Sequence, residues 1–190
     1  WHFNEQKMGC TLQELTDKVN KLGVKFGIWI EPEMVSEDSD LYREHPDWVL
    51  CFPGRKAVRC RNQLVLDFSR EDVRKLIFER ICSLLDQGNI AYVKWDMNRS
   101  IADVYSGENA PGKVTYDYML GVYDFLEKLI KRYPEILIEG CSGGGGRFDA
   151  GMLYYTPQIW CSDNTDAADR LRIQYGTSFF YPASPIGAHV

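Results

Sequence analysis

The stretch "YVKWDMNRS", residues Tyr92–Ser100, decides how the rest of the sequence is interpreted. It closes an apolar, β-prone run, "IAYVKWD", that stops at a lysine, a tryptophan and the carboxylate of Asp96. Strands that are buried on both faces of a parallel sheet are near-continuous apolar runs. In such folds the functional side chains follow the carboxyl ends of the strands. The stretch therefore predicts a buried strand with a functional site at its end.

The same pattern recurs on both sides of this strand. Apolar runs predict strands at residues 24–30, 64–67, 135–140 and 157–163, and a further strand beginning at residues 178–182. Apolar residues at helical spacing predict helices at residues 12–22, 70–87, 116–133 and 167–175, the first two capped by Thr11 and Ser69. Strands that alternate with helices indicate an α/β protein with a parallel sheet.

Charged residues at the strand ends favour a (β/α)8 TIM barrel over an open sheet. A complete barrel takes roughly 250 residues, whereas this chain has 190 residues and begins on a predicted helix. We therefore expect residues 1–190 to be the central part of a barrel, without its first strand or strands and without its last strands.

Composition narrows the classes of partner. The net charge is -5 and the basic residues form no cluster, so no nucleic-acid partner is expected. No apolar run reaches the roughly 20 residues of a membrane helix, so no membrane partner is expected either. Six scattered cysteines without a C-x-x-C pair indicate reduced thiols and a cytoplasmic protein. Three histidines without metal-ligand spacing predict no metal site and no cofactor.

Carboxylates dominate the predicted strand ends: Glu31, Glu33, Asp67, Asp96, Glu139, Asp163 and Asp166. Tryptophans accompany them, and this mixture suits a sugar, because the indole stacks on the ring while two carboxyls act on the glycosidic bond. A magnesium site of the enolase type is the rival use of acids at strand ends. Glu31, Glu33, Asp67 and Glu139 are interpreted as groups that bond neighbouring strands or loops, and Trp160 as a core residue.

Four segments carry a resemblance to a known family: "RNQLVLDF" (Arg61–Phe68), "KWDMNR" (Lys94–Arg99), "CSGGGGRFDAGMLYY" (Cys141–Tyr155) and "WCSDNTD" (Trp160–Asp166). In this order they resemble the glycoside hydrolase family 36 α-galactosidases of bacterial type. The resemblance covers essentially the whole chain. It implies a barrel with flanking β-domains that these residues do not include.

The resemblance also implies roles for individual residues. Asp96 corresponds to the nucleophile and Asp163 to the acid/base, while Asp166 is expected to open the following helix. The implied sugar contacts are Trp29, Arg61, Lys94, Trp95, Asn98, Cys141, Gly143 and Gly144. Of these, Lys94 is expected to keep Asp96 ionised, because the two side chains would share one face of the strand.

The implied activity is retaining exo-α-galactosidase hydrolysis of melibiose- or raffinose-type oligosaccharides by double displacement. The implied partner is a galactoside substrate, and the full-length protein is expected to be a homo-oligomer. Two alternatives remain from the sequence. One is a raffinose-type α-galactosyl transferase that uses the same two aspartates, and the other is a non-catalytic galactoside-binding or structural fragment.

Overall fold

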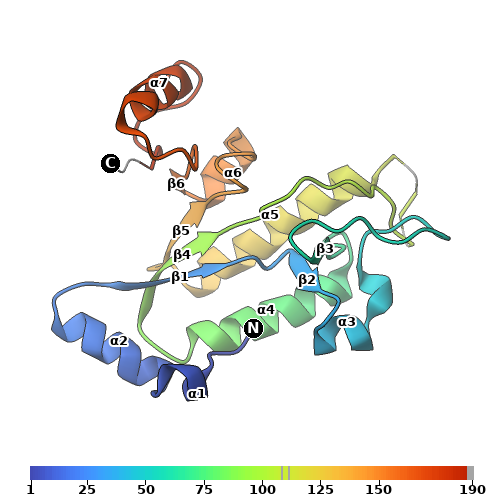
Figure 1. Ribbon diagram of the computed structural model, residues 1–190, viewed down its shortest axis with the longest axis horizontal. Helices are drawn as coiled ribbons and strands as arrows, with labels where there is room; N and C mark the ends of the chain where they lie inside the picture. Colours follow the sequence, from blue (N-terminus) through green and yellow to red (C-terminus); the bar gives the residue numbers. More distant parts are fainter. Residues whose placement is uncertain (108, 111, 188–190) are drawn as a thin grey trace.

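The fold is known from a computed structural model that describes residues 1–107, 109–110 and 112–187 (Figure 1). Its helices are α1 (Glu5–Met8), α2 (Leu12–Lys21), α3 (Asp40–Glu44), α4 (Glu71–Leu85), α5 (Val114–Arg132), α6 (Ala150–Tyr155) and α7 (Ala167–Thr177), with a 3-10 turn at Pro46–Trp48. Its strands are β1 (Phe26–Ile30), β2 (Met34–Ser36), β3 (Gln63–Val65), β4 (Ile90–Trp95), β5 (Leu137–Gly140) and β6 (Gln158–Ile159).

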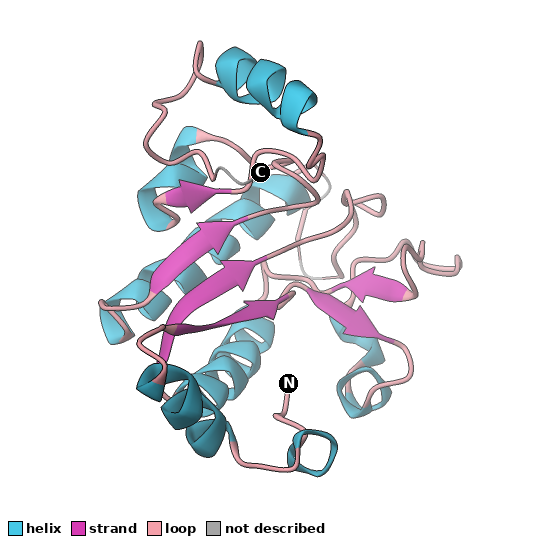
Figure 2. Ribbon diagram, turned by 60° about the vertical axis from the view of Figure 1, so that its left-hand side comes forward, coloured by secondary structure: helices cyan, strands magenta, loops and turns pink. Residues whose placement is uncertain are grey.

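The predicted parallel sheet is confirmed. It has four strands in the order β1-β4-β5-β6, and every neighbouring pair is parallel (Figure 2). The register places Ile30 beside Trp95, and Trp95 beside Gly140. The residues that follow these strands are therefore brought to one edge of the sheet.

The core lies between the sheet and two long helices, α4 and α5, which cover one face (Figures 1 and 2). Trp95 is fully buried there, and its ring meets Phe125 of α5 edge-on at 5.2 Å between centroids. Helix α5 passes so close to the loop between β3 and α4 that a Cβ on Gly121 would lie 1.9 Å from the carbonyl oxygen of Phe68. Only glycine fits at this crossing.

Local signals explain the helix starts. Thr11 caps α2 in a reciprocal capping box with Glu14, as its spacing predicts. The prediction that Ser69 caps the next helix is wrong, because the N-cap is Arg70 and the Ser69 hydroxyl bonds to Asp67 instead.

Two predicted strands differ in the structure. The run at residues 64–67 does form β3, but β3 pairs antiparallel with β2 in a separate two-stranded sheet, so it is not a strand of the parallel sheet. No strand begins at residues 178–182, where turns follow α7; in the described part of this segment the pairing with the parallel sheet is a single parallel bridge between Ile186 and Ile159 of β6. Phe179 and Phe180 in this segment are 69% and 86% exposed, whereas Tyr181 is partly buried and stacks on Phe148.

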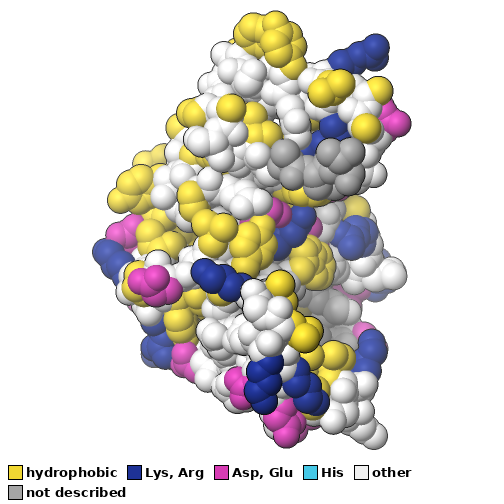
Figure 3. All heavy atoms as spheres, turned by 90° about the vertical axis from the view of Figure 1, so that its left-hand side faces the viewer, with side chains coloured by type: hydrophobic (Ala, Val, Ile, Leu, Met, Phe, Trp, Pro, Cys, Tyr) yellow, Lys and Arg dark blue, Asp and Glu magenta, His cyan; other side chains and the backbone are white. Residues whose placement is uncertain are grey.

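Apolar side chains are also exposed on α7. Leu171 and Tyr175 lie four residues apart on the helix, and Phe179, just after its end, continues the stripe. Figure 3 shows hydrophobic side chains at the top of the molecule, where α7 lies, and across its middle. Within the described part of the chain, no helix is both long and apolar enough to cross a membrane.

Candidate active site

The edge formed by the strand ends gathers the predicted site residues. Glu31, Asp96, Cys141 and Trp160 each come directly after a strand of the parallel sheet. Backbone bonds continue the ladder one step further: the amide of Asp96 donates to Ile30, that of Cys141 to Trp95, and that of Trp160 to Gly140. The carboxyl ends of four parallel strands thus form one site.

Asp96 is buried and surrounded by N–H donors. The Trp29 indole nitrogen and the Asn98 amide donate to its Oδ2 at 2.9 and 2.7 Å. The backbone amides of Met97, Ser142 and Gly143 donate to its Oδ1 at 2.8, 3.0 and 3.2 Å. This carboxylate is therefore fixed in position by five donors.

These donors decide the protonation state of Asp96. Burial acts to raise the pKa of this carboxyl, but the hydrogen bonds from Trp29, Gly143, Asn98 and Cys141 outweigh burial and lower the pKa to about 2. Burial raises the pKa of Cys141 itself to about 11, so its sulfur stays a neutral thiol. The site thus holds an ionised, oriented carboxylate at neutral pH.

The loop after β5 has an unusual backbone. Ser142, Gly143, Gly144 and Gly145 all have positive φ, between 60° and 93°. A Cβ on Gly144 would lie 2.8 Å from the amide nitrogen of Asp163. The loop therefore contacts Asp96 through the amides of Ser142 and Gly143, and Asp163 through Gly144, which brings the two predicted catalytic residues to one site.

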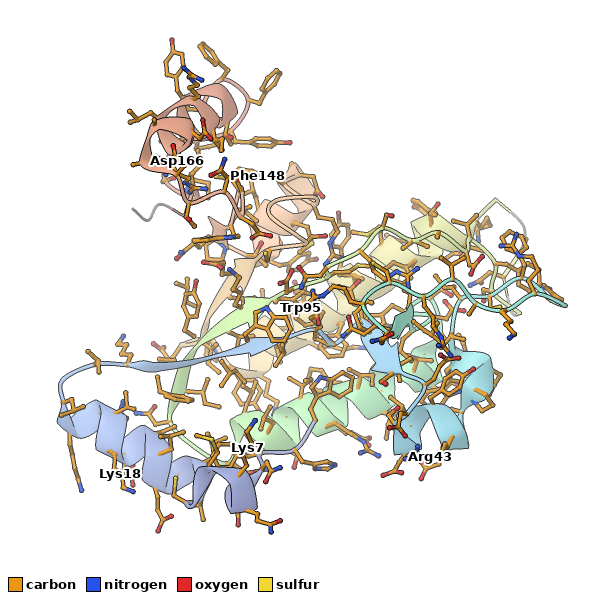
Figure 4. The ribbon with its side chains drawn as sticks, viewed as in Figure 1. Lys7, Lys18, Arg43, Trp95, Phe148 and Asp166 are labelled. Carbon is orange, nitrogen blue, oxygen red and sulfur yellow. The ribbon has the colours of Figure 1, made fainter. Side chains whose placement is uncertain are left out.

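Asp163 and Asp166 have different partners. The Trp160 indole nitrogen donates to Asp163 at 2.9 Å, and the Asp163 side chain is exposed. Asp166 is the N-cap of α7 and accepts from the amides of Ala168 and Asp169, both at 3.0 Å. The expectation that Asp166 opens the helix is confirmed, and Figure 4 shows it at the start of α7.

Trp160 is part of this site, although the sequence suggested a core residue. It is only partly buried, and the Lys94 ammonium lies 4.0 Å from its ring centroid. The guanidinium of Arg170 lies 5.6 Å from the same ring and donates to the carbonyl of Ser162. The available signal was the position of Trp160, three residues before Asp163 and directly after a strand.

Lys94 does not act on Asp96 as expected. Its ammonium pairs with Glu139 at 3.1 Å. Glu139 also accepts from Gln158 at 2.9 Å and from the Tyr92 hydroxyl. The donors around Asp96, rather than Lys94, lower its pKa.

Trp29 and Trp95 occupy opposite environments. Trp29 is 50% exposed, so its ring is open to a ligand while its nitrogen holds Asp96. Trp95 is 0% exposed, and its nitrogen donates to buried Glu33 at 2.8 Å. Figure 4 shows Trp95 within the body of the fold. Its burial leaves no ring face for a sugar, contrary to the role that the resemblance implies.

Arg61 stands on a tight two-residue hairpin. Arg61 and Asn62 have φ of 53° and 59°, and Cys60 and Gln63 exchange backbone bonds across the turn. Arg99 donates to the carbonyls of Val58 and Gln63, both at 2.8 Å, and so ties the hairpin to the segment that follows Asp96. The Arg61 side chain is half exposed and lies 3.5 Å from Glu31.

Glu31 links this hairpin to Asn98, the residue that donates to Asp96. It is buried and accepts from the side-chain amides of Asn98 at 2.6 Å and Gln63 at 2.9 Å. Its bonding matches the expected role of a group that joins loops. Among the described residues, no cluster of three His, Cys, Asp or Glu side chains is arranged to hold a metal ion.

Hollows lie on both sides of this arrangement. One, of about 300 Å³, is lined by Trp29, Glu31 and Gln63 among others. A second, of about 470 Å³, is lined by Asn98, Ser142, Gly143 and Arg147 among others. Residues that hold Asp96 thus also line space open to a ligand.

Comparison with known proteins identifies the family of this chain. The model of the melibiase family matches residues 1–190. The chain is 67% identical over 190 residues to the bifunctional alpha-galactosidase/sucrose kinase AgaSK of Mediterraneibacter gnavus, covering 100% of this chain and 20% of that protein. It is 53% identical to the alpha-galactosidase Mel36A of Lactobacillus acidophilus, of which it covers 26%.

Solved structures show the same relationship. The GH36 alpha-galactosidase AgaA from Geobacillus stearothermophilus matches with a TM-score of 0.96 and 54% identity, over 100% of this chain and 27% of that one. A variant of AgaA in complex with raffinose also matches with a TM-score of 0.96, at 53% identity and the same coverage. The chain thus spans about a fifth to about a quarter of the length of these relatives. On the family match over its whole length, the chain belongs to the melibiase family.

Proposed function

We propose that the full-length protein carrying this chain is a retaining exo-α-galactosidase that hydrolyses terminal α-galactosyl residues of melibiose- and raffinose-type oligosaccharides. One observation carries the proposal: an ionised carboxylate, Asp96, is held by five N–H donors, and two of them, the amides of Ser142 and Gly143, are on the loop that packs against Asp163. Family membership and a relative that binds raffinose support the substrate class.

In the proposed mechanism, Asp96 attacks the anomeric carbon while Asp163 protonates the departing oxygen. Asp163 then takes a proton from water, which attacks the galactosyl-enzyme and releases α-galactose. Asp96 suits the first role because its low pKa keeps it anionic. Asp163 suits the second because it is exposed at the rim, where a leaving group and water would enter.

The other proposed sugar contacts fall into two groups. Trp29, Arg61 and Lys94 present an open ring or a cation at the site, and Asn98 lies beside Asp96. Cys141, Gly143 and Gly144 form the wall after β5, where the absence of Cβ atoms at the two glycines allows a ligand to approach the backbone.

We propose further that residues 1–190 are the central part of a (β/α)8 barrel. The described sheet ends at β1 on one side, its β6 edge pairs only through a single parallel bridge between Ile159 and Ile186, and α7 exposes an apolar stripe. Further strands and helices of a longer chain would cover both. The proposed location is the cytoplasm, and the six free cysteines support it. Homo-oligomerisation of the full-length protein is proposed from the resemblance.

The direct test is release of nitrophenol from p-nitrophenyl α-galactoside by the full-length protein. We expect turnover of this substrate and of melibiose, and little or none of the β-galactoside or of the α-glucoside. Proton NMR of the first product should show the α-anomer of galactose before mutarotation. Initial formation of the β-anomer would overturn the retaining mechanism, and the absence of turnover would overturn the proposed activity.

Trp29→Phe should narrow the pH range of activity. The change removes an N–H donor from Asp96 while keeping an aromatic ring, so the pKa of Asp96 rises from about 2. Since the free enzyme needs the anion, kcat/KM of the variant should begin to fall at a higher pH than that of the wild type. We expect kcat/KM at neutral pH to drop roughly tenfold, as for loss of one hydrogen bond to a charged group.

Tyr42→Phe is the matched control for Trp29→Phe. Tyr42 is a half-buried aromatic residue of α3, away from the strand ends that form the site. Its pH profile should overlay that of the wild type, as judged from initial rates at pH values where circular dichroism shows native protein. An unchanged acid limb in Trp29→Phe would contradict the role assigned to the indole nitrogen.

A further inference from the structure

Glu33 is a fully buried carboxylate that takes no part in the proposed reaction. It accepts from the Trp95 indole nitrogen at 2.8 Å and from the Tyr118 hydroxyl at 2.6 Å. The Arg147 guanidinium donates to both of its oxygens, at 2.9 and 2.7 Å. Four donors from β4, α5 and the loop after β5 thus converge on one side chain, which leaves it a single position.

Two of these partners adjoin the surroundings of Asp96. Trp95 directly precedes Asp96 in the chain. Arg147 directly follows the glycine run of the loop whose Ser142 and Gly143 amides donate to Asp96. Glu33 therefore connects the strand that carries Asp96 with the loop that supplies two of its donors.

The loop has little of its own to fix its shape. Ser142 to Gly145 all adopt the left-handed backbone region, which costs a serine about 1–2 kcal/mol. Glycines, in addition, lose more conformational freedom on folding than other residues. Within the loop, the amide of Gly146 donates to Ser142 and that of Phe148 to Gly145, and the Ser142 hydroxyl donates to the carbonyl of Met97. A restraint from outside the loop is needed to keep its amides directed at Asp96.

A contribution to folding stability does not by itself explain why Glu33 and Arg147 form a buried ion pair. The Arg147 side chain is 14% exposed and that of Glu33 is 0% exposed, so both charges have lost most of their water. Buried ion pairs are often no more stabilising than apolar residues of the same volume, although they fix one geometry. The geometry fixed here is that of the loop end.

We propose that Glu33 and Arg147 are positioning residues of the α-galactosidase reaction, which hold the glycine loop so that the amides of Ser142 and Gly143 stay on Asp96. This inference rests on the proposed function. Neither residue needs to touch the substrate. Their effect reaches the reaction through the orientation and the hydrogen bonding of the nucleophile.

Arg147→Lys in the full-length protein tests the proposal, because lysine keeps the charge but lacks the planar fork of two nitrogens that donate to the two oxygens of Glu33. We expect kcat to fall about 10- to 100-fold with a smaller change in KM, since a misplaced catalytic group costs on that order. The acid limb of kcat/KM should also move to higher pH as Asp96 loses amide donors. The ionisable groups at the site besides Asp96 include Cys141, Glu31 through Asn98, Lys94 beside Cys141, and Asp163 across the glycine loop.

Two further variants sharpen the result. Tyr118→Phe removes one donor from Glu33 and leaves the ion pair, so it should shift kcat and the acid limb in the same direction by a smaller factor. Arg74→Met is the matched control: Arg74 is largely buried and donates to the carbonyls of Phe68 and Ser69, away from the site. It should lower Tm and leave the pH profile unchanged.

The outcomes separate the two proposals. If the wild type releases no nitrophenol from p-nitrophenyl α-galactoside, the proposed function fails and the inference falls with it. If the wild type is active and a natively folded Arg147→Lys keeps both kcat and the acid limb, only the inference is overturned. Should Arg147→Lys fail to fold, an unchanged acid limb in Tyr118→Phe overturns it instead.

Discussion

Asp96→Gly should abolish turnover and should be rescued by azide with formation of β-galactosyl azide. Without a nucleophilic carboxylate the first displacement has no attacking group, and loss of such a residue typically costs about 10⁴-fold or more in kcat. Azide that enters the vacated space attacks from the side of Asp96 and inverts the α-configuration. The measurement is the rate of nitrophenol release with and without azide, with the product anomer assigned by proton NMR.

Glycine is a better replacement here than asparagine. Asp96 accepts from three amides at one oxygen and from Trp29 and Asn98 at the other. An asparagine would turn its own NH₂ toward one of these donor groups, and the repulsion would displace the loop or the indole. Asp96→Asn should therefore be inactive and also less stable, so its loss of activity alone would not identify the nucleophile.

Asp67→Asn provides the matched control for Asp96. Asp67 is a buried carboxylate near the end of β3 that bonds the Ser69 amide and hydroxyl, outside the site. We expect it to lose stability but to keep kcat within about tenfold, since its effect on the reaction is indirect. Formation of α-galactosyl azide by Asp96→Gly, or activity near that of the wild type, would reject Asp96 as the nucleophile.

Much of the site could be predicted because strand ends in a parallel sheet meet. The apolar run that ends at Asp96 and the run that ends at Gly140 indicated a common edge, and the structure brings Asp96 and Cys141 together there. The capping box of α2 could be predicted for a similar reason, since its hydrogen bonds join only Thr11 and Glu14, three residues apart. Predictions succeeded where the deciding contacts lie within one element or follow from the alternation of strands and helices.

The predictions were wrong where a contact between segments distant in the sequence determines a side chain's direction or a strand's partner. Alternation along β4 turns Trp95 away from Asp96, and only the position of Glu33, 62 residues earlier, shows that its indole faces the core. Lys94 pairs with Glu139 because β4 and β5 place these residues side by side in register. The antiparallel pairing of β3 with β2 likewise depends on a return of the chain that no local pattern in residues 64–67 reveals.

Asp163→Ala should separate substrates by their leaving groups. A nitrophenolate departs without a proton, whereas the sugar alkoxide released from melibiose needs one. We expect kcat/KM for melibiose to fall about 10²- to 10⁴-fold, the range for loss of a general acid, and that for nitrophenyl α-galactoside to fall much less. Azide should intercept the galactosyl-enzyme from the side of Asp163 and give α-galactosyl azide, the opposite anomer to that from Asp96→Gly.

Asp166→Ala is the matched control for Asp163→Ala, because it removes a carboxylate from the same segment. Asp166 holds the first amides of α7, so its loss should cost about 1 kcal/mol of stability, seen as a lower Tm. The ratio of the two kcat/KM values should stay that of the wild type, since Oδ1 of Asp166 already accepts from two amides of the helix. A leaving-group dependence in Asp166→Ala that is absent in Asp163→Ala would exchange the two assignments and move the acid/base to the helix start.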